Sequence, residues 1–272
     1  MLEICALASG SNGNCYYIGN EKEAILVDAG ISTKQILQRM YQRRLDYRKI
    51  KAVFISHEHS DHVRGIRVLA KKLGIPAFFT EKTYRATWHK NRPLSYSPFN
   101  PGVSFVFKSF IIHPFLKNHD ASEPCSFRIE HEGIHVGVFT DIGAPCENVI
   151  THLKECHALF LETNYDEGML WNGKYPIYLK KRVASDVGHL SNKQTFELLT
   201  DHAGQQLQHI FLSHLSAENN TPEIAFNEIK PLENRFNIYL TSREEASPVI
   251  MLGKNVEKKF QSFPVQTILF KD

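Results

Sequence analysis

The segment VFISHEHSDH, residues 53–62, places three histidines and two acidic residues directly after an apolar run. The apolar part is typical of a buried strand, where polar groups are costly unless a partner satisfies them. His57 and His59 are two positions apart, so an extended backbone directs both imidazoles to the same side. Asp61 and His62 then open a helical pattern, whose positive N-terminal end disfavours a protonated histidine. Neutral imidazoles that bind a metal ion resolve this conflict, so the segment predicts a metal site rather than a solvated turn.

Three further strand-like runs end in side chains that can join this site. AILVD ends at Asp28, VGVFTD at Asp141 and IFLSH at His214. A single polar residue after a strand is usually an ordinary turn residue. Ligands nevertheless bind beyond the strand ends of open α/β sheets. We therefore expect the four strand ends to meet at one edge and to form one site.

Strands and helices are expected in both halves of the chain, which predicts an α/β (α+β) fold with sheets covered by helices on the outside. Strands are expected over residues 3–9, 15–19, 24–30, 51–56, 157–164 and 207–216, with a hairpin over 126–141. Helices are expected over residues 32–45, 61–74, 144–156, 191–204 and 221–233. Ser32 with Gln35 and Ser191 with Gln194 have the spacing of capping boxes. No long linker interrupts the pattern, so we expect one domain over residues 1–272.

Composition excludes several classes of protein. With 42% hydrophobic and 22% charged residues the chain is typical of globular proteins, and no apolar stretch reaches the length of a membrane span. The N-terminus does not resemble a secretory signal. Five cysteines without a CxxC pair favour free thiols, so we expect a cytoplasmic protein. A net charge of +3 permits an anionic partner without requiring one.

The motif HxHxDH at residues 57–62 resembles the signature of the metallo-β-lactamase fold superfamily, and the other strand-end residues match its landmarks in order. The match is most similar to the YycJ/WalJ-like exonuclease subfamily, through ASGSNGNCYYI, HDASEP, LETNYDEGML, GHLSN and HLSAENN. The resemblance implies a four-layer αβ/βα sandwich with two divalent metal ions. It also implies phosphodiesterase chemistry with a metal-bridging hydroxide as nucleophile, attributed in this subfamily to a 5′→3′ exonuclease that acts on DNA.

The resemblance implies roles for individual residues. The first ion is expected on His57, His59 and a third histidine, the second on Asp61, His62 and His214, with Asp141 bridging both. Asp28 is expected to orient a ligand imidazole by accepting its free N–H, although a strand-terminal turn residue is the alternative. Spacing alone leaves His113 and His119 open as the third histidine, and the HDA motif of the subfamily favours His119. Asp61 is also counted among the catalytic residues.

Asp141 bears on the reaction class. The antibiotic-hydrolysing members of this fold commonly have a cysteine ligand and lack a bridging aspartate, whereas its nucleases and other phosphodiesterases have one. A bridging carboxylate holds two cations about 3.5 to 4 Å apart, close enough to contact the attacking and leaving oxygens of a phosphoryl group. Imidazole and carboxylate ligands suit zinc, manganese or iron.

HLS occurs twice, at residues 189–191 and 214–216. His214 ends an apolar strand, as the last ligand of the superfamily does. His189 instead resembles the proton-donating histidine of the tRNA 3′-processing endonucleases of this fold, which is paired with a glutamate, here Glu162. A carboxylate fixes the tautomer of a histidine, as a general acid requires. The alternative is that His189 only packs under the start of the following helix.

Two segments are candidates for substrate binding. Ser11, Asn12 and Asn14 belong to a Gly/Ser/Asn loop that can present backbone N–H groups to a phosphate, and an ordinary turn is equally consistent. Lys180, Lys181 and Arg182 lie in a segment that mixes cations with aromatic residues, as nucleic-acid surfaces do. Its alternative is a helix with a solvated basic face.

The sequence therefore predicts a dinuclear metal-dependent phosphodiesterase, with DNA favoured over RNA as the substrate. A small-molecule phosphodiesterase or another metallo-hydrolase, acting on a thioester or a cyclic phosphate, is an alternative. An RNA-processing nuclease is another. A non-catalytic metal-binding regulatory protein is disfavoured, because an open dinuclear ligand set has no structural purpose. No obligate protein partner and no membrane is expected.

Overall fold

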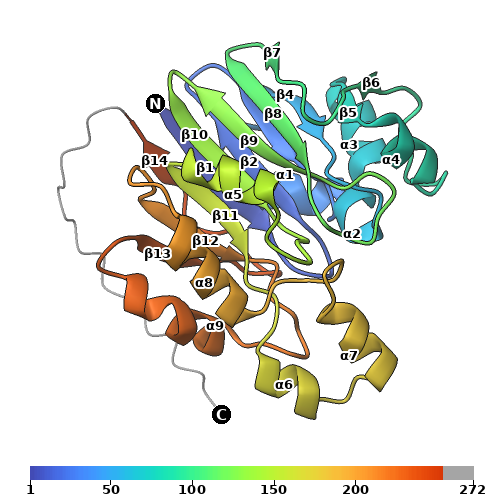
Figure 1. Cartoon of the computed structure of the whole chain (residues 1–272). Helices are drawn as coiled ribbons and strands as arrows, with labels where there is room; N and C mark the ends of the chain where they lie inside the picture. The colour runs from blue at the N-terminus through green and yellow to red at the C-terminus, as the bar shows by residue number, and fades with distance from the viewer. Residues whose placement is uncertain (254–272) are drawn as a thin grey trace.

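The computed structural model describes residues 1–253 and shows two mixed sheets packed face to face (Figure 1). The first sheet has the order β14 (Ile250–Leu252), β1 (Leu2–Ala8), β2 (Cys15–Gly19), β3 (Ala24–Val27), β4 (Ile50–Phe54), β5 (Ala77–Phe79) and β6 (Ser97–Pro98). The second has the order β13 (Asn237–Leu240), β12 (His209–Ser213), β11 (Ala158–Glu162), β10 (Ile134–Phe139), β9 (Cys125–His131), β8 (Phe110–Leu116) and β7 (Phe105–Phe107).

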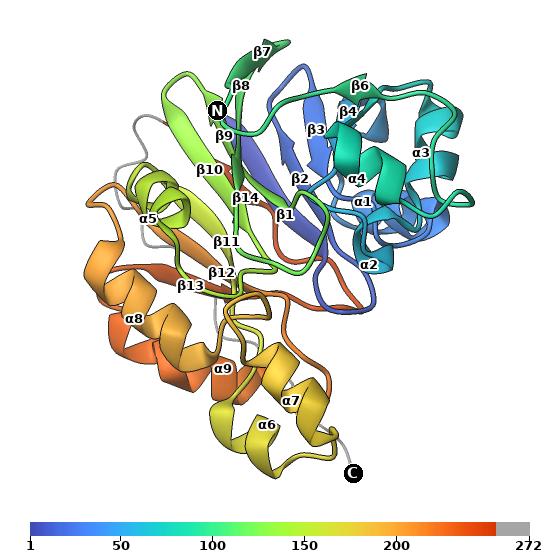
Figure 2. The ribbon, with the colours of Figure 1, turned by 45° about the vertical axis from the view of Figure 1, so that its right-hand side comes forward.

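Helices cover the outer face of each sheet. The first sheet is covered by α1 (Thr33–Gln42), α2 (Ser60–Val63), α3 (Ile66–Leu73) and α4 (Glu81–Ala86), and the second by α5 (Glu147–Lys154), α8 (Asn192–His202) and α9 (Pro222–Ile229). Figure 2 shows α6 (Glu167–Asn172) and α7 (Ile177–Val183) projecting from the body of the molecule. Two short 3-10 helices occupy Tyr47–Lys49 and Lys230–Leu232. None of the described helices has the length and apolar character needed to cross a membrane.

The core lies in three layers, which explains why the strand sequences are apolar on both sides. In β4, Ala52 and Phe54 face the second sheet, whereas Val53 faces the covering helices. Strands buried on both faces have near-continuous apolar runs rather than alternating ones. The predicted four-layer sandwich is confirmed. The prediction of one domain over residues 1–272 stays a prediction, because residues 254–272 lie outside the described part.

The predicted capping boxes are present at Ser32 and Ser191. The hairpin predicted over 126–141 appears as the antiparallel pair β9 and β10. One prediction is wrong in detail: the helix expected over 61–74 is broken into α2 and α3 at Gly65. The Gly65 N–H donates to Ala29 O at 2.7 Å, and a Cβ at this position would lie 2.1 Å from Ile31 O. The break lets the loop after β3 pack against the start of α3.

Candidate metal centre

Three strands end in the same unusual backbone conformation. Asp28 after β3, Asp141 after β10 and His214 after β12 have φ values of 61°, 57° and 57°. A positive φ is uncommon outside glycine, although Asp and His adopt it more often than most residues. Asp28 N–H still donates to Phe54 O at 2.9 Å, so the chain turns immediately after the last ladder bond. These turns direct the side chains into one site at the edge of the sandwich.

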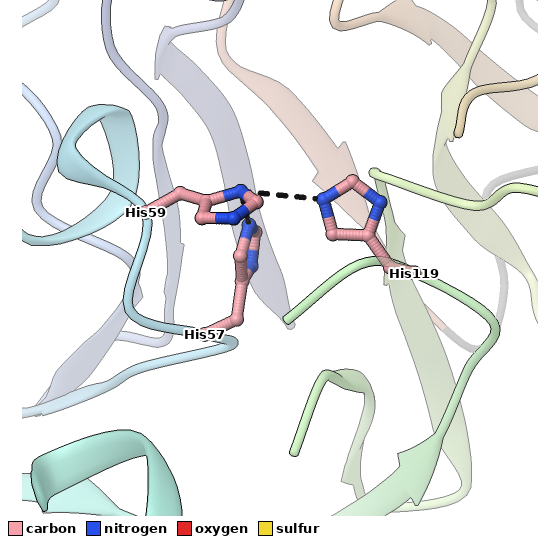
Figure 3. A group of neighbouring side chains, drawn as sticks. All are labelled: His57, His59 and His119. Carbon is pink, nitrogen blue, oxygen red and sulfur yellow. Dashed lines mark hydrogen bonds between the residues drawn. The ribbon is translucent and has the colours of Figure 1, made fainter. Parts of the chain in front are cut away.

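Three histidines form the first group (Figure 3). His57 Nε2 lies 3.2 Å from His59 Nδ1, and His119 Nε2 lies 3.4 Å from that same His59 nitrogen. His57 and His119 are buried, and their other ring nitrogens contact Ser56 Oγ at 2.9 Å and Gly188 O at 3.1 Å. The structure therefore brings His119 into the group. His113 lies on β8 instead, where it contacts Ser104 and Glu130.

Asp61, His62, Asp141 and His214 form the second group. Asp61 Oδ2 lies 3.4 Å from His62 Nε2 and 3.5 Å from His214 Nε2. Asp141 also reaches the first group: its Oδ1 lies 3.5 Å from His214 Nε2 and 3.8 Å from His119 Nε2. Its other oxygen, Oδ2, lies 3.2 Å from His62 Nε2.

A metal ion fits this set of atoms. Asp141 Oδ2 is buried, and its contact with His62 Nε2 at 3.2 Å is an ion pair without the alignment of a hydrogen bond, so a cation can bind this oxygen without breaking a hydrogen bond. Neutral imidazole nitrogens and carboxylate oxygens are the ligands that zinc, manganese and iron accept. Both groups can therefore hold a divalent cation.

The electrostatics of the site without metal show how strongly the charges are coupled. Burial opposes ionisation of His214, but Asp141, Asp61 and Glu162 outweigh it and raise the pKa of His214 to about 10. Burial also opposes ionisation of His62, but Asp141 and Asp61 outweigh it and raise the pKa of His62. The pKa of Asp141 is lowered because His214 and His62 outweigh its burial. A bound cation would balance the carboxylate charge in place of these protons, so metal binding would release them.

In the first group, the pKa values of His57 and His119 shift in the opposite direction. Burial lowers the pKa of His57 well below its ordinary value and lowers that of His119 to about 4, against the attraction of Asp141. Both imidazoles are therefore neutral at pH 7. Neutral imidazoles are the form that binds a metal ion.

Asp28 supports the second group from behind. Its Oδ2 lies 2.7 Å from His62 Nδ1, so it holds the imidazole with Nε2 toward Asp61 and Asp141. Ser56 completes this support: its N–H and Oγ both donate to Asp28 at 2.8 Å, and its Oγ also lies 2.9 Å from His57 Nδ1. Ser56 was not predicted from the sequence, because a serine after a strand has no distinguishing pattern.

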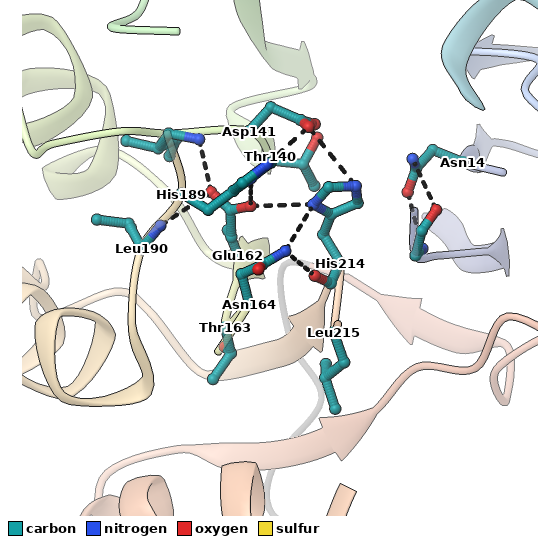
Figure 4. A network of polar contacts seen from close by, with 12 residues as sticks. Asn14, Thr140, Asp141, Glu162, Thr163, Asn164, His189, Leu190, His214 and Leu215 are labelled. Atoms are coloured by element: carbon teal, nitrogen blue, oxygen red, sulfur yellow. Dashed lines mark hydrogen bonds and ion pairs between the residues drawn. The ribbon is translucent and has the colours of Figure 1, made fainter. Parts of the chain in front are cut away.

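Glu162 and His189 lie beside the second group (Figure 4). Glu162 is fully buried at the end of β11, and its Oε1 lies 2.7 Å from His189 Nδ1 and 2.9 Å from His214 Nδ1. Burial raises the pKa of Glu162, but the two histidines outweigh it and hold the value at about 2. Asn164, which was not predicted from the sequence either, donates from Nδ2 to His214 O at 2.8 Å.

The Gly/Ser/Asn loop is only partly available to a ligand. Asn14 is fully buried, and its Nδ2 lies 3.2 Å from Asp61 Oδ2 and 3.1 Å from His62 Nε2. The N–H of Asn14 donates to Asp61 O at 2.8 Å. The placement assigns Asn14 to the support of the metal-ligand candidates rather than to a surface that meets substrate. Ser11 and Asn12 remain exposed at the rim.

Lys180, Lys181 and Arg182 all lie on α7, but they differ in their contacts. Arg182 forms an ion pair with Asp120 at 2.5 Å and so ties α7 to the residue after His119. Lys180 Nζ donates to Trp171 O at 2.7 Å, near the C-terminal end of α6. Lys181 is exposed, and no ion pair is found for it in the described part of the chain.

Residues 8–152 match the profile of the metallo-beta-lactamase superfamily. The chain belongs to this superfamily. It is 35% identical over 227 residues to exodeoxyribonuclease YycJ of Bacillus anthracis, which covers 82% of this chain and 86% of the relative. It is 33% identical over 256 residues to exodeoxyribonuclease WalJ of Streptococcus pneumoniae, which covers 89% of this chain and 95% of the relative. The predicted resemblance to the YycJ/WalJ subfamily is confirmed.

Comparison of structures supports the same fold. The metallo-beta-lactamase fold protein YhfI from Bacillus subtilis superposes with a TM-score of 0.68 at 16% sequence identity. The superposition covers 92% of this chain and 100% of YhfI. This chain and YhfI therefore share the same fold.

Proposed function

We propose that this protein is a dinuclear metal-dependent phosphodiesterase that degrades DNA as a 5′→3′ exonuclease in the cytoplasm. The observation that carries the proposal is the position of Asp141, whose two oxygens face both ligand groups and of which one has no hydrogen-bond partner. A carboxylate in this position suits two adjacent cations. The similarity to proteins named exodeoxyribonucleases supports DNA as the substrate.

Two divalent ions, zinc or manganese with iron as a further option, fit the seven side chains of the two groups. His57, His59 and His119 would hold one, Asp61, His62 and His214 the other, and Asp141 both. When bound, the ions activate a water molecule and neutralise the charge of the phosphate. Asp28, Ser56 and Asn14 keep the ligand atoms aimed inward through the contacts described above.

His189 is the proposed proton donor to the leaving oxygen. Its Nδ1 is fixed by Glu162, and its side chain is 20% exposed, against 2% for His214. Nε2 of His189 is therefore the nitrogen available to a substrate, and the buried Glu162 carboxylate holds the ring in this orientation through Nδ1. Glu162 is itself anchored, because the N–H of Ile142 donates to its Oε2 at 2.5 Å.

Substrate contacts are proposed on both sides of the site. Ser11 and Asn12 form one rim, and α7 with Lys181 forms the other, while Lys180 and Arg182 serve mainly to hold α6 and α7 in place. Two aromatic side chains, Trp171 on α6 and Tyr178 on α7, are exposed and can stack on bases.

The decisive experiment compares substrates. The metal-loaded protein is incubated with 5′-labelled and 3′-labelled single- and double-stranded DNA, with RNA and with bis(p-nitrophenyl) phosphate. We expect 5′-mononucleotides released from the 5′ end of DNA. Hydrolysis of the nitrophenyl ester without any cleavage of DNA would replace the proposal with a small-molecule phosphodiesterase, and preferred cleavage of RNA would replace it with an RNA nuclease.

A further inference from the structure

The charge of this chain is distributed very unevenly. Residues 62–119 contain ten Lys and Arg but a single acidic residue, Glu81, which gives this segment a formal charge of +9. The whole chain carries only +3, so the remaining residues sum to −6. A local excess of this size creates a positive potential that the net charge conceals.

Part of this charge lies in a row that starts at Arg64, just before α3, and continues along α3. Arg67 and Lys71 are four residues apart on one face of α3, Arg64 precedes the helix by two residues, and all three side chains are exposed. Within residues 1–253 none of the three lies within ion-pair distance of an acidic side chain, whereas Arg85 on the adjacent α4 is paired with Glu81 at 2.5 Å. The row therefore keeps its charge available for an external anion.

The loop after α4 adds an aromatic side chain to the row. Arg67 Nη1 donates to His89 O at 3.1 Å, which places residues 88–90 beside α3. Trp88 is 56% exposed, and Lys90 Nζ lies 5.0 Å from the centre of its ring. An exposed indole flanked by a cation provides a stacking face for a base and a partner for its phosphate.

A groove of about 470 Å³ lies between α3 and the segment that follows this loop. Its lining includes Arg67, Lys71 and Tyr96 together with Leu94, whose side chain is 82% exposed. The groove combines cations on one side with apolar side chains on the other. The charged residues and Trp88 together will be called the α3 surface, defined as Arg64, Arg67, Lys71, Trp88 and Lys90.

The α3 surface is continuous with the metal centre. Arg64 is two residues after His62, and its Nη1 donates to Asn12 O at 3.3 Å, at the exposed rim of the site. At about 1.5 Å per residue, α3 leads roughly 10 Å away from that rim. Figure 2 shows α3 and α4 on one side of α2, whereas α6 and α7 lie apart from them.

We propose that the α3 surface binds a single strand of the nucleic-acid substrate outside the metal centre, with phosphates on the cationic row and a base stacked on Trp88. The proposal rests on the proposed function and adds to it a second binding surface. It implies that a substrate needs several nucleotides beyond the reacting bond to be held fully.

Binding is measured by fluorescence anisotropy with labelled single-stranded oligonucleotides of 3 and 15 nucleotides. A chelator removes the metal ions, so that no cleavage occurs during the measurement. Loss of two phosphate contacts in Arg67→Gln/Lys71→Gln should make the slope of log K against log[salt] shallower by about 1.4 for the longer strand. Trp88→Ala should weaken binding of that strand by about 5- to 150-fold. The trinucleotide is too short to span the metal centre and the α3 surface, so its binding should be weakened much less by either change.

Lys154→Gln/Lys230→Gln is the matched control, because it removes the same charge from exposed positions over the second sheet. The melting temperature of both double variants is checked and should be unchanged. Trp88→Phe should restore most of the binding that Trp88→Ala loses, because phenylalanine can still stack on a base. Equal salt slopes for the α3 variant and the control would overturn the proposal, as would a parent that does not bind the longer strand. A parent that binds polyglutamate as tightly as the oligonucleotide, with the same dependence on Arg67 and Lys71, would overturn it in favour of an acidic protein partner. If the α3 variants lose binding as expected but the metal-loaded parent protein does not cleave DNA, only the proposed function is contradicted.

Discussion

His189 and His214 contact the same oxygen of Glu162, at 2.7 and 2.9 Å from their Nδ1 atoms. The two HLS segments of the sequence thus meet at one buried carboxylate, although they differ in exposure. His214 faces Asp61 and Asp141 through Nε2, whereas His189 stays partly open to solvent. One glutamate therefore orients both a metal-ligand candidate and a proton-donor candidate.

Substitution of His214 and substitution of His189 are expected to have different effects on metal content and activity. His214→Ala should lower metal content and activity together, since it removes a proposed ligand. His189→Ala should keep both metals and lose on the order of 10² to 10⁴ in rate on DNA. Bis(p-nitrophenyl) phosphate, whose leaving group departs without a proton, should recover much of the loss in His189→Ala only. A His189→Ala protein that has shed a metal ion, by elemental analysis, would contradict the assignment.

Glu162→Gln should combine both defects. The substitution keeps the size of the side chain but removes the charge that holds two imidazoles, so we expect a fall in rate together with weaker metal retention on dialysis. Loss of an orienting partner of a ligand typically weakens metal affinity about 10- to 100-fold. Ser56→Ala is the comparison: it should weaken metal binding through Asp28 and His62 but keep the proton donor, so the nitrophenyl ester should not rescue it.

Asp141 is expected to set the number of bound ions. Asp141→Asn leaves a neutral oxygen between the two groups and should reduce the metal content from two ions per chain toward one. Elemental analysis after gel filtration measures this directly. Retention of two tightly held ions in Asp141→Asn would show that Asp141 does not bridge them.

The three basic residues of α7 should not be equivalent. Lys181→Gln should make the salt slope of DNA binding shallower by about 0.7 to 0.9, the effect of one lost phosphate contact. Arg182→Gln should instead detach α7 from Asp120 and increase cleavage by trypsin between α6 and α7. If Lys181→Gln binds DNA with the salt slope of the parent, α7 does not contact the phosphates.

His152 should contribute to acid sensitivity away from the metal centre. Burial and the nearby Arg128 lower the pKa of His152 to about 4, whereas the unfolded chain protonates this residue near 6.5. Its contribution to the free energy of unfolding is therefore complete above pH 6.5 and lost as the pH falls toward 4. In urea titrations of metal-free protein, His152→Gln should lose less stability between pH 7.5 and 5 than the parent does.

Much of the fold follows from local sequence, because each apolar run and each cap depends on neighbouring residues. The helix break at Gly65 did not follow, since it depends on Ala29 and Ile31 packing against it from a distant loop. At the site, most ligand candidates were predictable from motifs at strand ends, whereas His119 was chosen over His113 only through the resemblance to the subfamily. The supporting residues Ser56 and Asn164 were not, because their contacts cross between strands. Asn14 was predicted to bind substrate in the Gly/Ser/Asn loop, and only the folded chain shows it buried against Asp61.

The left-handed turns at Asp28, Asp141 and His214 complicate alanine scanning of this site. An alanine with positive φ costs roughly 1 to 2 kcal/mol more than one in a right-handed conformation, so each such variant changes the backbone as well as the side chain. Asparagine tolerates this conformation better, and glycine adopts it freely. Pairing each alanine variant with asparagine and glycine at the same position therefore separates a lost ligand from a relaxed turn. A glycine variant that lacks metal yet unfolds at a higher temperature than the alanine variant would reveal how much conformational energy the fold stores in aiming that side chain.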